Sequence, residues 1–248
     1  MGRLRLVEAF AGTLSKVTTA GALHEALETI SNDMGFDFFA LAHHPTILEP
    51  DDPGVRLHNY PPEWVKVYDD SGFGASDPVR RASNRRLVGF AWSDIARLIA
   101  VTSGDRHVLA RGWEHGVGDG YTIPANVPGE AVGSCSFAVM AGRSLPSDQI
   151  MVAQLVGGLA FECARRIHGD FAAPTTPRLT HRQTECVLWS GRGKTDWEIA
   201  RIMGISHETV IQHLKLARER YGVQKRATLV VRALFDGLFS FADILRRR

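Results

Sequence analysis

Long apolar runs are absent from this sequence of 248 residues, and no stretch approaches the roughly 18 apolar residues that a membrane-spanning helix requires. The N-terminus begins with the basic segment from Met1 to Arg5, but Glu8 interrupts it before an apolar core forms. That pattern is not typical of a secretory signal. We therefore expect a cytoplasmic protein without membrane contact.

Cysteine is also scarce, since the chain contains only Cys135, Cys163 and Cys186. They are odd in number, form no Cys-x-x-Cys pair and show no metal-ligand spacing with the 10 histidines. We expect each to be a small buried apolar residue. The sequence therefore predicts no metal and no other cofactor.

Hydrolytic motifs are missing as well. Asp77 with His43 or His44, or Ser136 with a histidine, could form a hydrolytic pair. However, no Gly-x-Ser-x-Gly elbow, metal cluster or pair of carboxylates accompanies them. We therefore predict that the protein is not an enzyme.

Charge is distributed unevenly along the chain. Up to Pro177 there are 15 Lys and Arg against 20 Asp and Glu, whereas from Arg178 onward there are 14 against 7. A basic C-terminal segment on an acidic body is typical of a nucleic-acid-binding domain attached to another domain. A solvated basic surface is the simpler alternative.

The boundary between these parts is rich in proline and small residues. Residues 171–177 show no helical or strand periodicity, which is typical of a linker. We therefore expect one domain at residues 1–170, a linker at 171–177 and a second domain at 178–248.

The first domain mixes helical and strand patterns. Apolar periodicity predicts helices near 4–18, 22–34 and 147–167, the last with Ser147 as N-cap, and one after Pro61-Pro62. Strands are predicted near 36–43, 55–60, 121–127 and 134–141. The expected fold is α+β, an α-β-α sandwich around an antiparallel sheet.

The second domain is predicted to be all-α, a four-helix bundle. The helices are expected at 180–189, 196–203, 207–221 and 227–238. Ala200 and Gly204 fit the tight turn of a helix-turn-helix.

The third of these helices has two different faces. Val210, Leu214, Ala217 and Tyr221 recur at spacings of four, three and four, so the polar residues between them must face outward. An outer face with Gln and Lys suits the major groove of DNA. A helical pair with an ordinary polar surface is the alternative.

This segment resembles the C-terminal domain of LuxR-type regulators. The matching residues are Leu179-Thr180, Arg182, Glu185, Trp189, Gly193-Lys194-Thr195, Glu198-Ile199-Ala200, Ile205-Ser206, Thr209-Val210, His213 and Tyr221-Gly222-Val223. The resemblance implies binding to double-stranded DNA. The DNA-contacting candidates are Lys194, Thr195, Ser206, His207, Glu208, Thr209, Ile211, Gln212, Lys215, Arg218, Lys225 and Arg226.

Aromatic and acidic residues cluster in the middle of the first domain. Tyr60, Trp64 and Tyr68 are spaced by four on one helical face, and Asp77 precedes a proline. Taken singly, the stripe suits a helix core and Asp77 suits an N-cap.

As a set, these residues resemble the acyl-homoserine-lactone-binding domain of quorum-sensing LuxR-type proteins over about residues 4–168. The resemblance implies seven ligand-binding residues, which are Tyr60, Trp64, Tyr68, Asp77, Phe90, Trp92 and Ser136.

Their chemistry matches the ligand that the resemblance implies. The Trp64 N–H suits the lactone carbonyl, the Asp77 carboxylate suits the amide N–H, and the Tyr60 and Ser136 hydroxyls suit the amide carbonyl. Tyr68, Phe90 and Trp92 would enclose the lactone. The small residues Ala42, Gly74 and Ser134 are expected to line the acyl tail.

The leading hypothesis is a ligand-responsive quorum-sensing regulator that binds an inverted-repeat promoter site as a homodimer, with the 147–167 helix as the contact and RNA polymerase as a further partner. One alternative is a LuxR-type receptor for a different small molecule. Others are a regulator that binds DNA without ligand and is released by it, and a ligand-independent DNA-binding or protein-interaction module.

Overall fold

The computed structural model describes residues 2–44, 55–84, 86–127, 132–168 and 177–245. The chain divides into two compact units, residues 1–172 and 173–248. Apart from Pro177, the expected linker at 171–177 lies outside the described residues. Within the described ranges, no helix is both long enough and apolar enough to cross a membrane.

The N-terminal unit is built on an antiparallel five-stranded sheet with the strand order β2-β1-β5-β4-β3. The strands are β1 (Phe38–His43), β2 (Arg56–His58), β3 (Phe90–Ala91), β4 (Val117–Ala125) and β5 (Gly133–Met140). The four predicted strands are present, and the short edge strand β3 was not expected. The central strand β5 is buried on both faces, so Phe137 points into one layer and Ser136 into the other.

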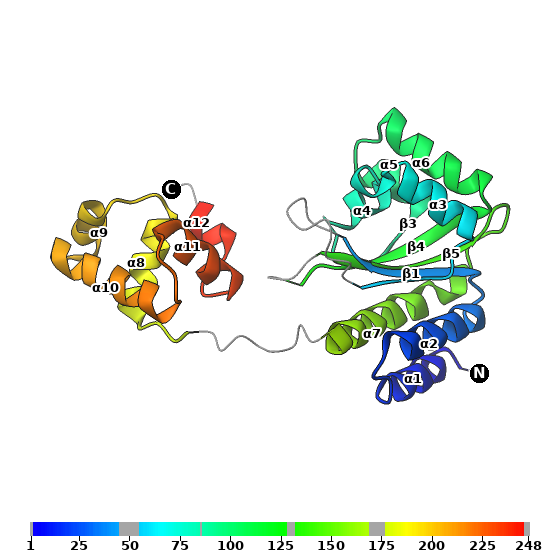
Figure 1. The fold of residues 1–248 in the computed structure, drawn as a ribbon, viewed down its shortest axis with the longest axis horizontal. Coiled ribbons are helices and arrows are strands. Elements are labelled where there is room, and N and C mark those ends of the chain that lie inside the picture. Colours follow the sequence, from blue (N-terminus) through cyan, green and yellow to red (C-terminus); the bar gives the residue numbers. More distant parts are fainter. Residues whose placement is uncertain (1, 45–54, 85, 128–131, 169–176, 246–248) are drawn as a thin grey trace. The chain divides into compact units, whose positions relative to one another are not determined.

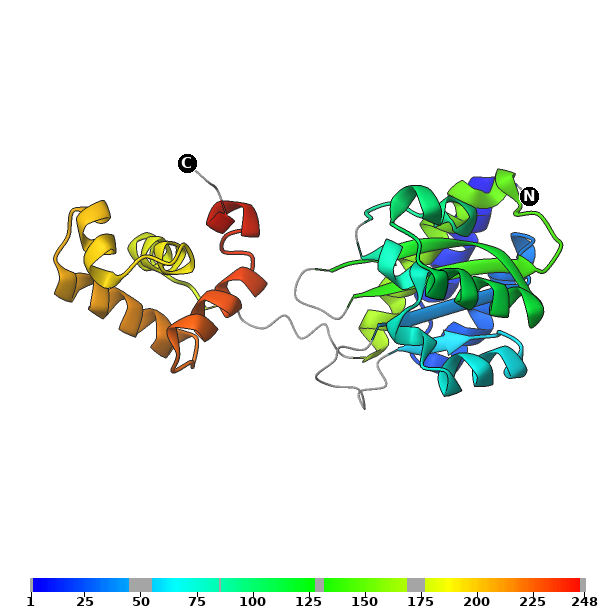
Figure 2. The same cartoon turned by 90° about the horizontal axis from the view of Figure 1, so that it is seen from above.

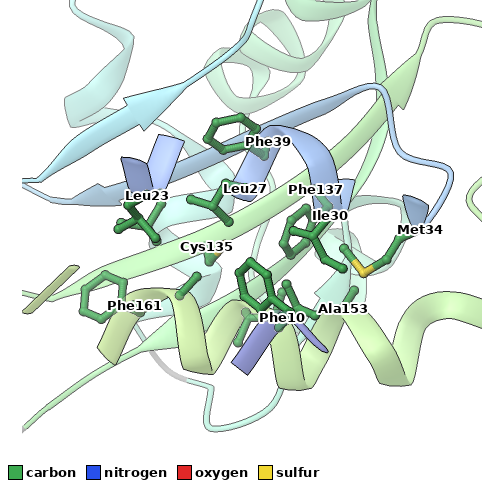
Figure 3. Close-up of a cluster of buried hydrophobic side chains, with 14 of the residues drawn as sticks. Phe10, Leu23, Leu27, Ile30, Met34, Phe39, Cys135, Phe137, Ala153 and Phe161 are labelled. Atoms are coloured by element: carbon green, nitrogen blue, oxygen red, sulfur yellow. The ribbon is translucent and has the colours of Figure 1, made fainter. Parts of the chain in front are cut away.

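Three helices cover one face of this sheet, namely α1 (Arg3–Leu14), α2 (Ala20–Asp33) and α7 (Ile150–His168) (Figure 1). Figure 3 shows Phe10 of α1, Leu27 of α2 and Phe161 of α7 gathered against Phe39 and Phe137 of the sheet. These side chains are nearly inaccessible to water, so this layer is the main apolar core of the unit.

The opposite face is covered by α3 (Pro62–Asp70), α4 (Pro78–Ser83), α5 (Ile95–Leu98) and α6 (Ser103–Glu114) (Figure 1). Helix α6 was not predicted, although its reciprocal cap between Thr102 and Asp105 is visible in the sequence as Thr-x-x-Asp. Arg81 of α4 donates to the buried Asp105 carboxylate at 2.6 Å and so joins α4 to α6. Helices on both faces make the α-β-α sandwich that was expected.

The start of the long helix differs from the prediction. Ser147 lies inside a 3₁₀ turn (Ser147–Gln149), whose N-cap position is Pro146 and has no side-chain hydrogen bond. The turn begins one residue earlier because the Pro146 carbonyl accepts a hydrogen bond from the Gln149 N–H at 2.8 Å. Ser147 is therefore not the N-cap.

The C-terminal unit is built from helices (Figure 2). They are α8 (His181–Gly191), α9 (Asp196–Met203), α10 (His207–Arg220), α11 (Arg226–Phe235) and α12 (Phe241–Leu245). Four were predicted, whereas α12 was missed although Ser240 accepts from the Asp243 N–H in a short helix-capping pattern. The all-α class and the helix-turn-helix of α9 and α10 are confirmed.

Candidate ligand cavity and DNA-binding face

A cavity of about 440 Å³ lies on the sheet face that α3, α4 and α6 cover. Ala40 of β1 and Ser136 of β5 contribute to its floor. Six of the seven predicted ligand-binding residues line it, namely Tyr60, Trp64, Tyr68, Asp77, Trp92 and Ser136. The fold therefore brings side chains from a long stretch of sequence to one cavity.

The aromatic wall of the cavity comes from α3. Pro62 fits the first turn of this helix, where its missing N–H is not needed. Trp64 and Tyr68, one helical turn apart, meet edge to face with ring centroids 5.6 Å apart. Trp64 is only 7% exposed, and among the described residues its indole N–H has no hydrogen-bond partner in the protein. A donor in the cavity wall without a protein partner is available to a ligand.

Asp77 has two roles in this geometry. Its Oδ1 accepts from the Val79 N–H at 2.8 Å and so caps α4, while its Oδ2 accepts from the Tyr68 hydroxyl at 2.7 Å. The N-cap interpretation is therefore correct, yet the same carboxylate also lines the cavity.

The two cavity tyrosines are held in the protonated state. Burial, reinforced by the neighbouring Asp77 carboxylate, raises the pKa of Tyr60 and of Tyr68 above the ordinary value for tyrosine. Both side chains thus keep a proton to donate at neutral pH.

A second polar connection crosses the sheet. The Trp92 indole N–H donates to Thr122 Oγ1 at 2.8 Å, and Thr122 Oγ1 lies 2.7 Å from Ser136 Oγ. Gly120 makes room for the Trp92 ring, because a Cβ at that position would come within 2.5 Å of it. Thr122 was not predicted as a site residue.

Two sequence expectations do not match the cavity. Phe90 is 5% exposed and packs with Val79, Ala82 and Ile95 rather than among the lining residues. Gly74 does not line the cavity either, since the Arg80 guanidinium lies against it. The ligand contact of Phe90 stays a prediction, and the sequence alone does not reveal how the segment around α4 folds back over the sheet.

The other small residues expected near a tail, Ala42 and Ser134, do line the cavity. His44 and Arg80 line it too, and neither was predicted as a site residue. The alternation of β1 places Ala40, Ala42 and His44 on one face, which was the available signal for His44.

Metal binding finds no support in the described part of the chain, where no group of three or more His, Cys, Asp or Glu could hold an ion. The three cysteines are free and buried, as expected.

The helix-turn-helix is defined by its caps and its turn. Thr195 Oγ1 accepts from the Glu198 N–H at the start of α9, and Ser206 Oγ accepts from the Thr209 N–H at the start of α10. Gly204 between the helices has φ 65°, in the left-handed region that favours glycine.

The core side of α10 matches the prediction, because Val210, Leu214 and Ala217 are buried. On the other side, four candidate DNA contacts are solvent-exposed, namely Glu208, Ile211, Gln212 and Lys215. The exposed side of α10 therefore combines three polar side chains with the apolar Ile211.

The remaining candidate DNA contacts differ in the interactions that they already make within the C-terminal unit. His207 stacks on the exposed Trp197 ring at 4.2 Å, and Arg218 donates to the Gln224 carbonyl at 3.0 Å. Arg226 is bound to the Asp196 carboxylate and to a backbone carbonyl inside the unit.

Among the other candidates, Lys194 pairs with Glu198 at 3.2 Å, while Lys225 is exposed at the start of α11. The contact between Arg226 and Asp196 joins α11 to α9, so Arg226 stabilises the packing of these two helices.

Comparison with known proteins accounts for both units. Residues 19–166 match the autoinducer-binding domain model, and residues 177–233 match the model of bacterial regulatory proteins of the LuxR family. The first match alone spans more than half of the chain.

Individual relatives match along most of the chain. The transcriptional activator protein VanR of Vibrio anguillarum is 29% identical over 229 residues, covering 90% of this chain and 92% of its own length. The quorum sensing-dependent transcriptional regulator RpaR of Rhodopseudomonas palustris is 31% identical over 228 residues, covering 88% and 89%. The crystal structure of Escherichia coli SdiA superposes with a TM-score of 0.64 at 23% identity, covering 98% and 99%.

These relatives are transcriptional regulators, in agreement with the prediction that the chain is not an enzyme. The two family matches correspond in order to the two units of the fold. The chain therefore belongs to the LuxR family of bacterial transcriptional regulators, with an autoinducer-binding domain followed by a helix-turn-helix DNA-binding domain.

Proposed function

We propose that this regulator senses an N-acyl-homoserine lactone in its cavity and binds an inverted-repeat promoter site as a homodimer. The observation that carries the proposal is the unpartnered Trp64 N–H in a cavity that also holds the Asp77 carboxylate. A donor and an acceptor in one buried space fit the lactone carbonyl and the amide N–H of such a ligand.

The head group has a further hydrogen bond to make, through its amide carbonyl. Tyr60 and Ser136 both line the cavity and both carry a hydroxyl proton. Tyr68 and Trp92 add apolar surface that would enclose the lactone ring. A ligand that lacked one of these groups would leave a buried polar atom unpaired, which costs roughly 1–3 kcal/mol.

Ligand binding would also complete the layer between the sheet and α3–α6. A ligand that binds only the folded state stabilises that state by mass action. The proposed sensor covers residues 1–170, the linker 171–177 and the DNA-binding domain 178–248, in a protein that acts in the cytoplasm where its DNA is found.

Dimer formation is supported by the outer side of α7. Met151, Leu155 and Leu159 are spaced by four and are 72%, 49% and 36% exposed. An apolar stripe of this kind on a soluble domain is typical of a contact surface. Two paired sensors would bring two α10 helices to half-sites about one helical turn apart, and RNA polymerase would be recruited from there.

The test uses the full-length protein and a panel of N-acyl-homoserine lactones. We expect at least one lactone to raise the melting temperature and to bind in isothermal titration calorimetry. We also expect it to change the affinity for DNA selected from a randomised pool. A folded protein that responds to no lactone in any of these assays would contradict the proposal.

A second candidate is a receptor of the same fold for a different small molecule. A structure of the Escherichia coli protein SdiA contains octanoyl-rac-glycerol, an acylated polyol. Binding of monoacylglycerols together with no response to lactones would favour this candidate. DNA binding by the ligand-free protein and release by lactone would instead favour the reversed response.

A further inference from the structure

Two polar side chains meet at one end of the cavity. His44 Nε2 lies 3.0 Å from Ser134 Oγ, and both residues line the cavity while being only 7% exposed. Neither residue belongs to the set assigned above to the lactone head group. The pair therefore needs an explanation of its own.

The strand register locates the pair relative to the head group. Ser136 pairs with Ala40, and Ser134 pairs with Ala42 one step further along the sheet. Four residues of strand separate Ala40 from His44, which is ~13 Å at ~3.3 Å per residue. Ser134 and His44 thus lie along β1 and β5 on the far side of Ser136.

The head-group end lies in the opposite direction. Trp64 packs with Ala138 and Val117, and Ala138 pairs with Phe38 at the start of β1. An acyl chain that leaves the head group would therefore extend over Ala40 and Ala42 toward Ser134 and His44.

A plain alkyl chain fits this end poorly. Burying the Ser134 hydroxyl and the His44 ring against methylene groups removes them from water without giving them a new partner. Ala40 and Ala42 already leave space for the chain above the sheet. The polar pair is therefore not needed to make room for it.

The histidine is uncharged. Burial first, and then the nearby Arg80 charge, lower the pKa of His44 to about 3, although hydrogen bonding with the Asn84 side chain acts in the opposite direction. A neutral imidazole has one donor and one acceptor nitrogen. His44 Nδ1 is buried and makes no close hydrogen bond among the described residues, and the Asn84 side chain is a nearby polar group that acts on the ring.

Either tautomer leaves Ser134 with unused hydrogen-bonding capacity. If Ser134 donates to Nε2, its oxygen can still accept, and if Nε2 donates to Ser134, the hydroxyl proton is free. A ligand hydroxyl can serve as the partner in both cases, whereas a ketone or an ether can only accept.

We propose, on the basis of the function proposed above, that the signal is a homoserine lactone whose acyl group carries an uncharged hydroxyl at its far end. This hydroxyl hydrogen-bonds to Ser134, which His44 holds in place. Ser134 and His44 are then specificity-determining residues for the acyl group.

Arg80 offers a competing partner for that end of the ligand, because it lines the cavity and its charge acts on His44. Its guanidinium already lies 4.0 Å from the Asp77 carboxylate, donates to the Gly74 carbonyl and lies over the Tyr68 ring. Because these contacts already engage the Arg80 guanidinium, they favour a neutral ligand group over a carboxylate.

The test compares three N-acyl-homoserine lactones of equal chain length that end in a methyl, a hydroxyl or a carboxylate group. Isothermal titration with the full-length wild-type protein is repeated at several chain lengths. We expect the hydroxyl ligand to bind tightest, by at least about fivefold over the methyl ligand at the best length.

The outcomes separate this inference from the proposed function. Equal affinities, or a preference for methyl, overturn the hydroxyl assignment while leaving lactone sensing intact. A preference for the carboxylate overturns it in favour of Arg80. Failure of every lactone to bind contradicts the proposed function itself, and this inference with it.

Two variants test the residues. Ser134→Ala and His44→Leu should each lose the preference for the hydroxyl ligand while binding the methyl ligand as well as the wild type or better. Ser93→Ala, which removes an exposed serine from the same lining, should keep the preference. If His44→Leu does not fold, Ser134→Ala decides alone, and a preference retained in that variant overturns the proposal.

Discussion

The Tyr68 hydroxyl donates a hydrogen bond of 2.7 Å to Asp77 Oδ2, while the Val79 N–H donates to Oδ1 of the same carboxylate at 2.8 Å. A carboxylate has about four lone-pair sites, so Asp77 can still accept from a ligand. Capping a helix and binding a ligand are thus compatible roles for one residue, and the cap fixes the direction in which the second oxygen points.

Asp77→Asn should separate these two roles. The amide keeps an oxygen for the Val79 N–H, but its NH₂ group faces a hydroxyl and a ligand N–H that both need an acceptor. We expect lactone affinity to fall roughly 10- to 100-fold with little change in the melting temperature of the free protein. Isothermal titration measures this, with Asp94→Asn on the surface as the matched control. Wild-type affinity in Asp77→Asn would refute the assignment of the amide contact.

Tyr68→Phe should have a smaller effect in the same direction. The ring keeps its contact with Trp64, while Asp77 loses one of its two orienting donors. We expect a loss of affinity of roughly 3- to 10-fold. A loss larger than that of Asp77→Asn would instead indicate that the Tyr68 hydroxyl contacts the ligand directly.

Thr122→Val tests the connection from Trp92 to Ser136. The indole N–H can only donate, so Thr122 accepts from it. Either hydroxyl can donate in the contact between Thr122 and Ser136, and we predict that Thr122 donates, which leaves the Ser136 proton for the ligand. We expect Thr122→Val to weaken lactone binding about as much as Ser136→Ala does. In a double-mutant cycle, the combined variant should lose less binding free energy than the sum of the losses in the two single variants. Additive losses would show that the two hydroxyls act independently.

The exposed side of α10 predicts two kinds of DNA defect. Lys215→Ala should weaken binding to all sequences and reduce the slope of log affinity against log salt by about 1. Gln212→Ala should mainly reduce discrimination between the selected site and altered sites. Fluorescence anisotropy at several salt concentrations distinguishes these effects. Arg232→Ala on α11 removes the same charge as Lys215→Ala, and an equal loss in that variant would argue against a specific role for α10.

His44 predicts an acid-sensitive sensor. Its pKa is lowered to about 3 in the folded protein from 6.5, so the unfolded chain binds more protons between these values. This contribution to stability is complete above pH 6.5 and is lost as the pH falls toward 3, with a slope of at most ~1.4 kcal/mol per pH unit.

Urea unfolding of the full chain at neutral and mildly acidic pH measures this loss. The difference in the free energy of unfolding between the two pH values should be smaller in His44→Leu than in the wild type. His181→Gln, at an exposed histidine, should leave this difference unchanged. An unchanged pH difference in His44→Leu would contradict the prediction.

Much of the fold could be predicted because local pattern and burial agree. Thr180 and Ser206 cap helices at the starts that the sequence predicted, and Val210 faces the core that its periodicity indicated. Where local signals were weak the prediction failed, as at Ser147, because the preceding Pro146 carbonyl starts the turn earlier.

The candidate site was predicted in part. Trp64 and Tyr68 could be grouped from their helical spacing, and Asp77 from the family resemblance. Thr122 and His44 could not, because their roles depend on strand register, which pairs residues far apart in the sequence. The position of Phe90 could not be predicted for the same reason, since its place in a separate cluster depends on how α4 and α5 pack.

The sequence by itself determined the division into an acidic body and a basic C-terminal segment, the helix-turn-helix and the aromatic stripe, because each depends on composition or on spacing within one element. Only the tertiary structure decided which polar groups share the cavity and which ones remain unpaired. The reason is physical: hydrogen bonds such as those from Tyr68 to Asp77 and between His44 and Ser134 join different elements, and their geometry exists only once the sheet and its helices have packed.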